Sequence, residues 1–190
     1  MRQNGLEANI LKLAKTGTVI FGICGGYQML GEHLSDPNGV EAGGELRGMG
    51  LLPIETVFAG QKTRTRMTGS FGTVGGVLSN LSDIAVEGYE IHMGVTTLHE
   101  EANSLTVLGY EKKTDGAYKD NIYGTYLHGV FDKEQVVKEI VIALGKNKGI
   151  DMTQAVAFDM EAFKETQYDI LATELRKHLD MKAIYNILSI

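Results

Sequence analysis

The chain contains one cysteine, Cys24, within the segment Gly22-Ile-Cys-Gly-Gly26. This segment has the Gly-x-nucleophile-x-Gly spacing of a nucleophile elbow, in which glycines permit a sharp turn that lifts the nucleophile above a sheet. A helix that begins directly after the turn favours the thiolate, and the backbone N–H of Gly25 would point at an oxyanion formed on attack. Cys24 is therefore the candidate nucleophile, and a buried structural cysteine beside a glycine turn is the alternative.

A thiol nucleophile needs a base, and five histidines are available, at positions 33, 92, 99, 128 and 178. His128 directly follows a predicted strand, as Cys24 does. If the two strands are parallel, both side chains emerge at the carboxyl edge of the sheet, where open α/β sheets place their sites. His92 also ends a predicted strand and is the second choice. No Cys/His spacing resembles a metal site, so none is predicted.

The elements around Cys24 follow from hydrophobic periodicity. Residues Asn4 to Lys15 predict an amphipathic helix, and Thr18 to Ile23 form a continuous apolar run typical of a strand buried in a parallel sheet. Residues Tyr27 to Leu34 predict a second helix, which would place His33 more than two turns from Cys24. The order helix–strand–turn–helix predicts an α/β fold with an open, largely parallel, doubly wound sheet.

The rest of the chain predicts inserted short strands and three further helices. The strand candidates are 51–58, 63–68, 86–93, 104–112 and 121–127. A capping box that begins at Asp132 is expected to open the next helix. Residues Asp159 to Leu179 predict a longer helix with Phe163 and Leu171 facing inward, and Asp180 caps a last helix that ends at Leu188.

Composition narrows the class of protein. The chain has 190 residues, 43% hydrophobic residues and a net charge of −6, which fit one globular domain over 1–190 and give no basic patch for nucleic acid. No apolar run is long enough to span a membrane. One cysteine excludes an internal disulfide and fits a reducing cytoplasm. An α/β core normally supplies a strand before its first helix, so the first strand and an upstream domain are expected to be missing, and a homo-oligomer remains open.

Three ordered motifs carry a resemblance to a known family. Gly22-Ile-Cys-Gly-Gly-Tyr-Gln-Met-Leu-Gly31 is similar to the class I glutamine amidotransferase signature. Together with Gly88-Tyr-Glu-Ile-His-Met-Gly94 and Gly124-Thr-Tyr-Leu-His-Gly-Val-Phe-Asp132, it resembles the C-terminal domain of the cobyric acid synthase family. The segment 167–180 is similar to the end of that family, so the resemblance covers nearly the whole chain.

This resemblance implies a reaction. Cys24 would attack the side-chain amide of glutamine, His128 would protonate the departing ammonia, and water would clear the thioester. Ammonia would then amidate an ATP-activated carboxylate of a corrin, converting adenosylcobyrinic acid a,c-diamide to cobyric acid on the route to cobalamin. Gln28 matches a position that contacts glutamine, and Glu90 and His92 line either the glutamine pocket or the seam with the synthetase domain. A solvated helix residue and ordinary strand alternation are the respective alternatives.

The sequence departs from the usual class I pattern in two ways that affect the expected site. Many class I enzymes carry a glutamate two residues after the catalytic histidine, and that position is Val130 here. A Cys/His dyad is therefore expected, with another group orienting the imidazole. The chain also has no Gly-x-x-x-x-Gly-Lys-Ser/Thr phosphate loop, so no cofactor is expected in this domain, and ATP and Mg belong to the synthetase domain.

Two other functions fit the same residues. One is a γ-glutamyl-type Cys hydrolase, which releases ammonia or an amine without an acceptor. The other is a non-catalytic amidotransferase-like partner of a synthetase. Because the upstream loop that donates a second oxyanion N–H is expected to be missing, weak or no glutaminase activity is predicted for the 190-residue chain by itself.

Overall fold

The computed structural model describes residues 1–152, 154 and 159–188, apart from the side chains of residues 61 and 62. The chain divides into two compact units, Met1–Ala157 and Phe158–Ile190. The expectation of a single amidotransferase domain over 1–190 stays a prediction.

The first unit contains the strands and most of the helices. Its helical elements are η1 (Arg2–Asn4), α1 (Leu6–Lys15), α2 (Gly25–Leu30), η2 (Gly76–Leu81) and α3 (Glu134–Asn147). Its strands are β1 (Ile20–Ile23), β2 (His33–Asp36), β3 (Gly44–Arg47), β4 (Ile54–Phe71), β5 (Ala85–Leu98), β6 (Thr106–Leu108), β7 (Lys113–Asp115), β8 (Ala117–Lys119), β9 (Ile122–Thr125) and β10 (Leu127–His128).

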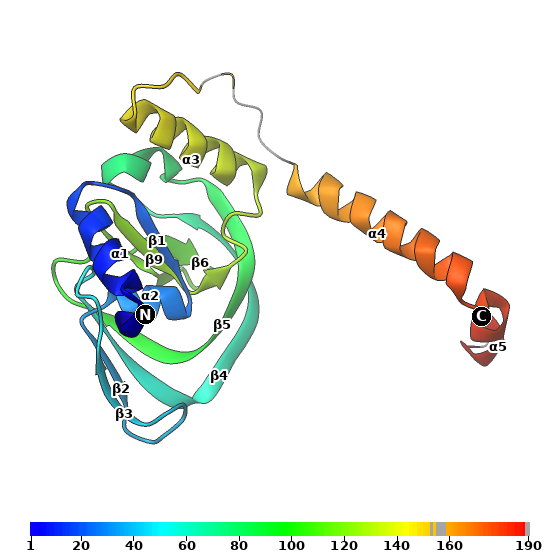
Figure 1. Ribbon diagram of the computed structural model, residues 1–190, viewed down its shortest axis with the longest axis horizontal. Coiled ribbons are helices and arrows are strands. Elements are labelled where there is room, and N and C mark those ends of the chain that lie inside the picture. The colour runs from blue at the N-terminus through cyan, green and yellow to red at the C-terminus, as the bar shows by residue number, and fades with distance from the viewer. Residues whose placement is uncertain (153, 155–158, 189–190) are drawn as a thin grey trace. The chain divides into compact units, whose positions relative to one another are not determined.

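These strands form two sheets. One has the order β1-β9-β8, and the other contains the path β10-β5-β4-β2-β3 with β6 paired to β4 and β7 to β6. Figure 1 shows β4 and β5 as two long curved strands that run side by side, and they are paired antiparallel with a register shift between Phe58 and Thr63. Of the strands predicted from the sequence, 63–68 lies within β4 and 86–93 within β5.

The α/β class is confirmed, but the expectation of a largely parallel sheet is wrong. Among the described strands, the parallel pairs are β1 with β9 and β2 with β4, and the remaining pairs are antiparallel. Short connections such as that between β8 and β9 join antiparallel neighbours, whereas a parallel pair needs a long crossover. Several neighbouring strands are joined by short connections rather than by crossover helices, so most of the described pairs are antiparallel.

Two apolar clusters hold the first unit together. The larger joins Phe71, Leu78, Leu105, Tyr123 and Leu127 to Val136 of α3, which also contacts η2. The smaller packs Tyr27 and Leu30 of α2 against Leu52, Ile54 and Ile122. Full burial of such side chains contributes roughly 1.5–3 kcal/mol each, so α2 is firmly anchored despite its length.

Close packing under α2 depends on two glycines. A Cβ on Gly22 would lie 2.7 Å from Leu30 Cδ1, and one on Gly124 would lie 2.3 Å from Tyr27 Cδ2. These distances are far shorter than a van der Waals contact, so glycine at both positions lets α2 fold back onto β1 and β9.

The helix after Cys24 is shorter than the sequence predicted. It ends at Leu30, and His33 and Leu34 belong to β2 instead. A Cβ on Gly31 would meet Ile54 at 2.8 Å, and the N–H of Glu32 donates to the carbonyl of Ile54. Contact with Ile54 of β4 therefore ends the helix at Leu30, and the following residues pair with β4 as strand β2.

The next predicted cap is also displaced. The N-cap of α3 is Lys133, which carries no side-chain cap hydrogen bond, so the helix begins one residue later than a cap at Asp132 predicts. Part of the predicted core face is present, since Val136 is fully buried.

The second unit consists of α4 (Met160–His178) and α5 (Met181–Leu188). The predicted cap at Asp180 is confirmed, because its side chain accepts from the N–H of Ala183. Asp159 caps α4 in the same way by accepting from the N–H of Ala162. Phe163 and Leu171, predicted to face inward, are 45% and 56% exposed.

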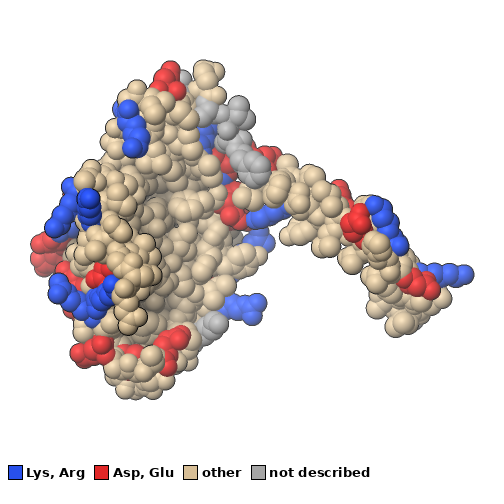
Figure 2. All heavy atoms as spheres, viewed as in Figure 1, with Lys and Arg blue, Asp and Glu red and all other residues tan. Residues whose placement is uncertain are grey.

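On the face shown in Figure 2, basic and acidic side chains lie interspersed. No helix in the described part of the chain is long and apolar enough to cross a membrane.

Candidate active site

Cys24 lies at a strained turn between β1 and α2. Its backbone has φ 52° and ψ −114°, a conformation that residues other than glycine rarely adopt. Its N–H donates to the carbonyl of Thr125 at 2.9 Å, and its own carbonyl accepts from the N–H of Gln28 at 3.0 Å. Strain of this kind is held in place by surrounding structure and is concentrated at functional sites. The predicted elbow is therefore present.

The Cys24 side chain faces the edge of β5. Its thiol donates to the carbonyl of Ile91 at 3.4 Å, and the residue is only partly buried. A Cβ added to Gly25 would meet no atom within 4 Å, so there is open space beside the first N–H after the nucleophile. A substrate carbonyl could approach that N–H without a steric barrier from Gly25 itself.

His128 lies along the same segment of β5. It ends β10 and pairs with Tyr89, two residues along β5 from the carbonyl that binds the Cys24 thiol. Its Nε2 is buried and has no hydrogen-bond partner among the described residues. An unpaired imidazole nitrogen can accept a proton, so His128 retains the capacity expected of a base. In this structure the thiol is bound to Ile91 rather than to that nitrogen.

His92, the second candidate base, has both ring nitrogens engaged. Nδ1 lies 2.7 Å from the carbonyl oxygen of Gly94, and Nε2 lies 2.7 Å from Oε1 of Glu90. Hydrogen bonds from His92 and then Lys113 lower the pKa of Glu90 to about 2, so this carboxylate is ionised and only accepts. Both nitrogens of His92 are therefore engaged with oxygen atoms, and neither is open to a thiol proton.

Gln28 is buried rather than solvated. It is 6% exposed, and its Nε2 donates to the hydroxyl of Tyr126 at 3.1 Å. The Tyr126 hydroxyl lies 2.6 Å from Oγ1 of Thr96, and the Tyr126 ring stacks on His92 with centroids 3.7 Å apart. Tyr126 therefore connects Gln28 to His92, a link that sequence reasoning did not identify.

A cavity of about 220 Å³ opens beside this network. Its walls include Glu90, His92, Lys113, Asp115 and Tyr126. Tyr27 also lines it, and the Tyr27 hydroxyl is buried without a partner among the described residues. Cys24 and His128 are not among the lining residues. The structure thus brings together Gln28, Glu90 and His92 as one group and places Cys24 and His128 along β5 as another.

The remaining histidines lie outside both groups. His33 pairs with Arg47 across β2 and β3, His99 lies 3.6 Å from Glu32, and His178 is on the exposed surface of α4. No group of three or more His, Cys, Asp or Glu side chains within the described ranges is arranged to hold a metal ion.

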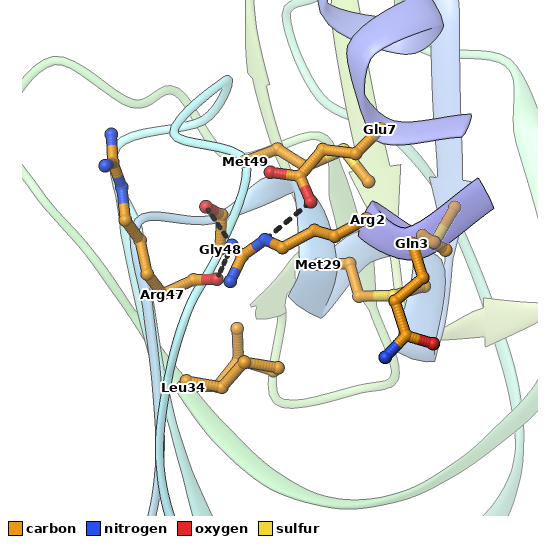
Figure 3. Close-up of a pocket in the computed structure, with 10 residues that line it drawn as sticks. Arg2, Gln3, Glu7, Met29, Leu34, Arg47, Gly48 and Met49 are labelled. Atoms are coloured by element: carbon orange, nitrogen blue, oxygen red, sulfur yellow. Dashed lines mark hydrogen bonds and ion pairs between the residues drawn. The ribbon is translucent and has the colours of Figure 1, made fainter. Parts of the chain in front are cut away.

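A second cavity, of about 290 Å³, lies near the first residues of the chain (Figure 3). Met29, Leu34 and Met49 give it apolar walls. Arg2 crosses it, with Nε 2.7 Å from Glu7 and its guanidinium also bound to the carbonyls of Arg47 and Gly48 (Figure 3). None of the predicted site residues lines this cavity.

Comparison with known proteins defines the class. Residues 1–136 match the family of CobB/CobQ-like glutamine amidotransferase domains, and the chain belongs to this family. It is 49% identical over 194 residues to the cobyric acid synthase of Ruminiclostridium cellulolyticum, and 49% identical over 203 residues to that of Lachnoclostridium phytofermentans. In each case 99% of this chain is covered, but the chain spans only 38% and 39% of those relatives.

Solved structures give a weaker likeness. A glutamine amidotransferase crystal structure has a TM-score of 0.49 at 14% identity, covering 76% of this chain and 70% of that one. Another, from Thermotoga maritima, has a TM-score of 0.45 at 14% identity, covering 75% of this chain and 53% of that one.

Proposed function

We propose that this chain hydrolyses glutamine within a larger amidating enzyme, with Cys24 as nucleophile and His128 as base. The observation that carries the proposal is the strained Cys24 elbow beside a buried, unpaired imidazole nitrogen on the same segment of β5. Membership of the amidotransferase family supports the same chemistry.

The reaction balances with these two side chains and water. His128 takes the thiol proton, and the thiolate forms a bond to the side-chain carbonyl carbon of glutamine. The N–H of Gly25 donates to the oxyanion of the tetrahedral intermediate. His128 returns the proton to the departing nitrogen, which leaves as ammonia. Water, with His128 as base, then cleaves the thioester to glutamate and restores the thiol.

Preference for His128 over His92 rests on hydrogen bonding. The Nε2 of His128 has no partner within the described part of the chain, whereas both nitrogens of His92 lie 2.7 Å from oxygen atoms. Val130, at the position of the usual class I glutamate, is 1% exposed and apolar, so it cannot orient the imidazole. Cys24 and His128 therefore act as a dyad, without the glutamate that completes a triad in many class I enzymes.

Gln28, Glu90 and His92 support a site for the polar groups of glutamine. Glu90 is an ionised carboxylate, the ammonium of Lys113 is bound to it, and both line one cavity with His92. A zwitterionic amino acid needs both charges, and Tyr126, which stacks on His92, also binds Gln28 on the elbow helix.

For the whole protein, we propose amidation of a corrin. The relatives that cover this chain are cobyric acid synthases, and the chain spans about 38% of their length. The ammonia would be used in the ATP- and Mg-dependent conversion of adenosylcobyrinic acid a,c-diamide to cobyric acid, in cobalamin biosynthesis in the cytoplasm. The corrin and ATP would bind to the remainder of such a protein.

Covalent labelling tests the nucleophile. Treatment with 6-diazo-5-oxo-norleucine, a glutamine analogue, should add one group at Cys24, detected by mass spectrometry, and glutamine should slow the labelling. Cys24→Ala should remain unlabelled. His128→Ala should be labelled at least about 10²-fold more slowly, whereas His99→Ala, a surface histidine variant, should match the original chain.

The outcomes separate the alternatives. Labelling at another residue, or equal labelling of Cys24→Ala, contradicts the nucleophile assignment. A non-catalytic partner would react no faster with the analogue than with iodoacetamide. A γ-glutamyl-type hydrolase would be labelled equally well but would turn over γ-glutamyl amides other than glutamine without an acceptor.

A further inference from the structure

Asp115 is a buried carboxylate in the wall of the cavity that contains Glu90 and His92, and no step of the proposed reaction uses it. It is 6% exposed, at the end of β7. Two donors converge on it, the hydroxyl of Thr125 and the backbone N–H of Tyr126 at 3.3 Å. The Thr106 hydroxyl lies 3.1 Å from the Asp115 carbonyl and 3.3 Å from the carboxylate. Burial raises the pKa of Asp115, and the bonds from Thr125 and Tyr126 oppose that rise. Burying a carboxylate costs free energy unless hydrogen bonds compensate, so the groups that bind Asp115 indicate what the residue does.

Thr125 connects this carboxylate to both members of the proposed dyad. The Thr125 carbonyl accepts the N–H of Cys24 at 2.9 Å, which fixes the strained elbow. The Thr125 hydroxyl, which donates to Asp115, also accepts the N–H of Leu127 at 3.0 Å. Leu127 is followed directly by His128 in β10. One threonine thus holds the backbone at the nucleophile and at the base.

Asp115 determines how that threonine is oriented. A hydroxyl that accepts from Leu127 has one proton to give, and Asp115 takes it. The second carboxylate oxygen binds the N–H of Tyr126, so residues 125 and 126 are both fixed by one side chain. Gly116 allows this approach, since a Cβ there would lie 2.3 Å from the carbonyl of Gly124.

We propose that Asp115 is a positioning residue that aligns Cys24 and His128 through Thr125. The inference rests on the proposed function, because it assumes that these two side chains react. Asp115 touches neither the thiol nor the imidazole and acts on where both backbones lie. A misplacement of about 1 Å at a reacting group can lower a rate by about 10²-fold.

Asp115→Asn, with Asp36→Asn as matched control, tests this role in the full chain. Asp36 is also 6% exposed and accepts three backbone N–H bonds at 2.8 Å, from Val40, Glu41 and Gly43. The maximal rate of Cys24 labelling by 6-diazo-5-oxo-norleucine should fall by about 10²-fold in Asp115→Asn, with the half-saturating concentration within about threefold. Asp36→Asn should keep both values within about twofold of the original chain.

Thr125 variants keep the test valid if Asp115→Asn does not fold. Thr125→Val removes the hydroxyl at similar volume and should lower the maximal rate, whereas Thr125→Ser keeps the hydroxyl and should retain it. The double variant of Asp115→Asn and Thr125→Val should lose no more than the larger single loss, because both changes break one linkage. Losses that multiply, or an unchanged rate in Asp115→Asn and Thr125→Val, would overturn the proposal.

Failure of the proposed function has a different signature. If a whole synthase that contains this chain shows no saturable labelling of Cys24 that glutamine slows, the proposed function is wrong whatever the variants do. The positioning role is then decided by the pH dependence of Cys24 alkylation with iodoacetamide. That profile should change together in Asp115→Asn and Thr125→Val and stay unchanged in Asp36→Asn, and an unchanged profile in all three overturns it.

Discussion

Glu90→Gln should destabilise the protein at neutral pH and have a much smaller effect in acid. Glu90 is 2% exposed and bonds to His92 at 2.7 Å and to Lys113 at 2.5 Å. These partners lower its pKa from 4.5 to about 2, a difference of 2.5 units. One unit corresponds to about 1.4 kcal/mol, so the shift contributes roughly 3 kcal/mol. Lys113 is half-exposed and screened by solvent, so the measured figure should lie at or below this value.

The sign of the pH dependence follows from the direction of the shift. A lowered pKa in the folded state gives stability that is complete above the unfolded pKa of 4.5 and is lost as pH falls toward about 2. Urea unfolding followed by far-UV circular dichroism is suitable, because the chain has no tryptophan. The stability gap between the original chain and Glu90→Gln should shrink steadily below about pH 5.

Glu101→Gln serves as the control for Glu90→Gln. Glu101 pairs with Lys119 on the surface, with 72% of its side chain exposed, so its removal should have little effect at any pH. A gap for Glu90→Gln that stays constant from neutral pH to about pH 3 would refute the reasoning, because linkage to the ionisation of Glu90 requires that it change.

Two further predictions concern the base and the packing beside Gln28. In a whole synthase containing this chain, His128→Ala should lower glutamine-dependent turnover by about 10³-fold or more and preserve turnover with added ammonia, and loss of both would indicate a folding or docking role. Gly94→Ala should lower the melting temperature, because its Cβ would lie 2.6 Å from Gln28 Nε2 and 2.7 Å from Thr56 Cγ2. Such overpacking costs about 1–3 kcal/mol. Gly60→Ala, where a Cβ meets nothing within 4 Å, is the control, and equal melting temperatures for the two variants would contradict the packing argument.

The elbow could be predicted from the sequence because its determinants are local. A β-rich run ending in Gly-x-Cys-Gly-Gly specifies strand, tight turn and helix within about ten residues. The structure has β1, a positive φ at Cys24 and α2 in that order. The end of α2 could not be predicted in this way. Tyr27, Leu30 and Leu34 have helical spacing, but contact with the distant Ile54 of β4 ends the helix at Leu30.

The hydrogen bonds among Asp115, Thr125 and Tyr126 also could not be predicted, because they join residues from separate strands. In the sequence, Thr114-Asp-Gly116 has the composition of a turn, and nothing marks Asp115 as a partner of Thr125. Their contact depends on the register of β8 with β9, which places Ala117 opposite Gly124. Tyr126 likewise reaches Gln28 and Thr96 only because three separate elements meet there. The chemistry-bearing residues are local in sequence, whereas the residues that position them are not.

The strained backbone of Cys24 is held in place by buried hydrogen bonds and packing around it. A non-glycine residue at such a positive φ costs on the order of 1–3 kcal/mol and persists only where its surroundings hold it. Here the backbone is held by Thr125, itself fixed by Asp115, and by the packing of Tyr27 on Gly124. The thiol, in contrast, is held by one long bond to the carbonyl of Ile91, and S–H is a weak donor. On the proposed mechanism this asymmetry is useful, because the sulfur keeps a fixed position on a rigid backbone while its proton can be transferred to His128 at little cost.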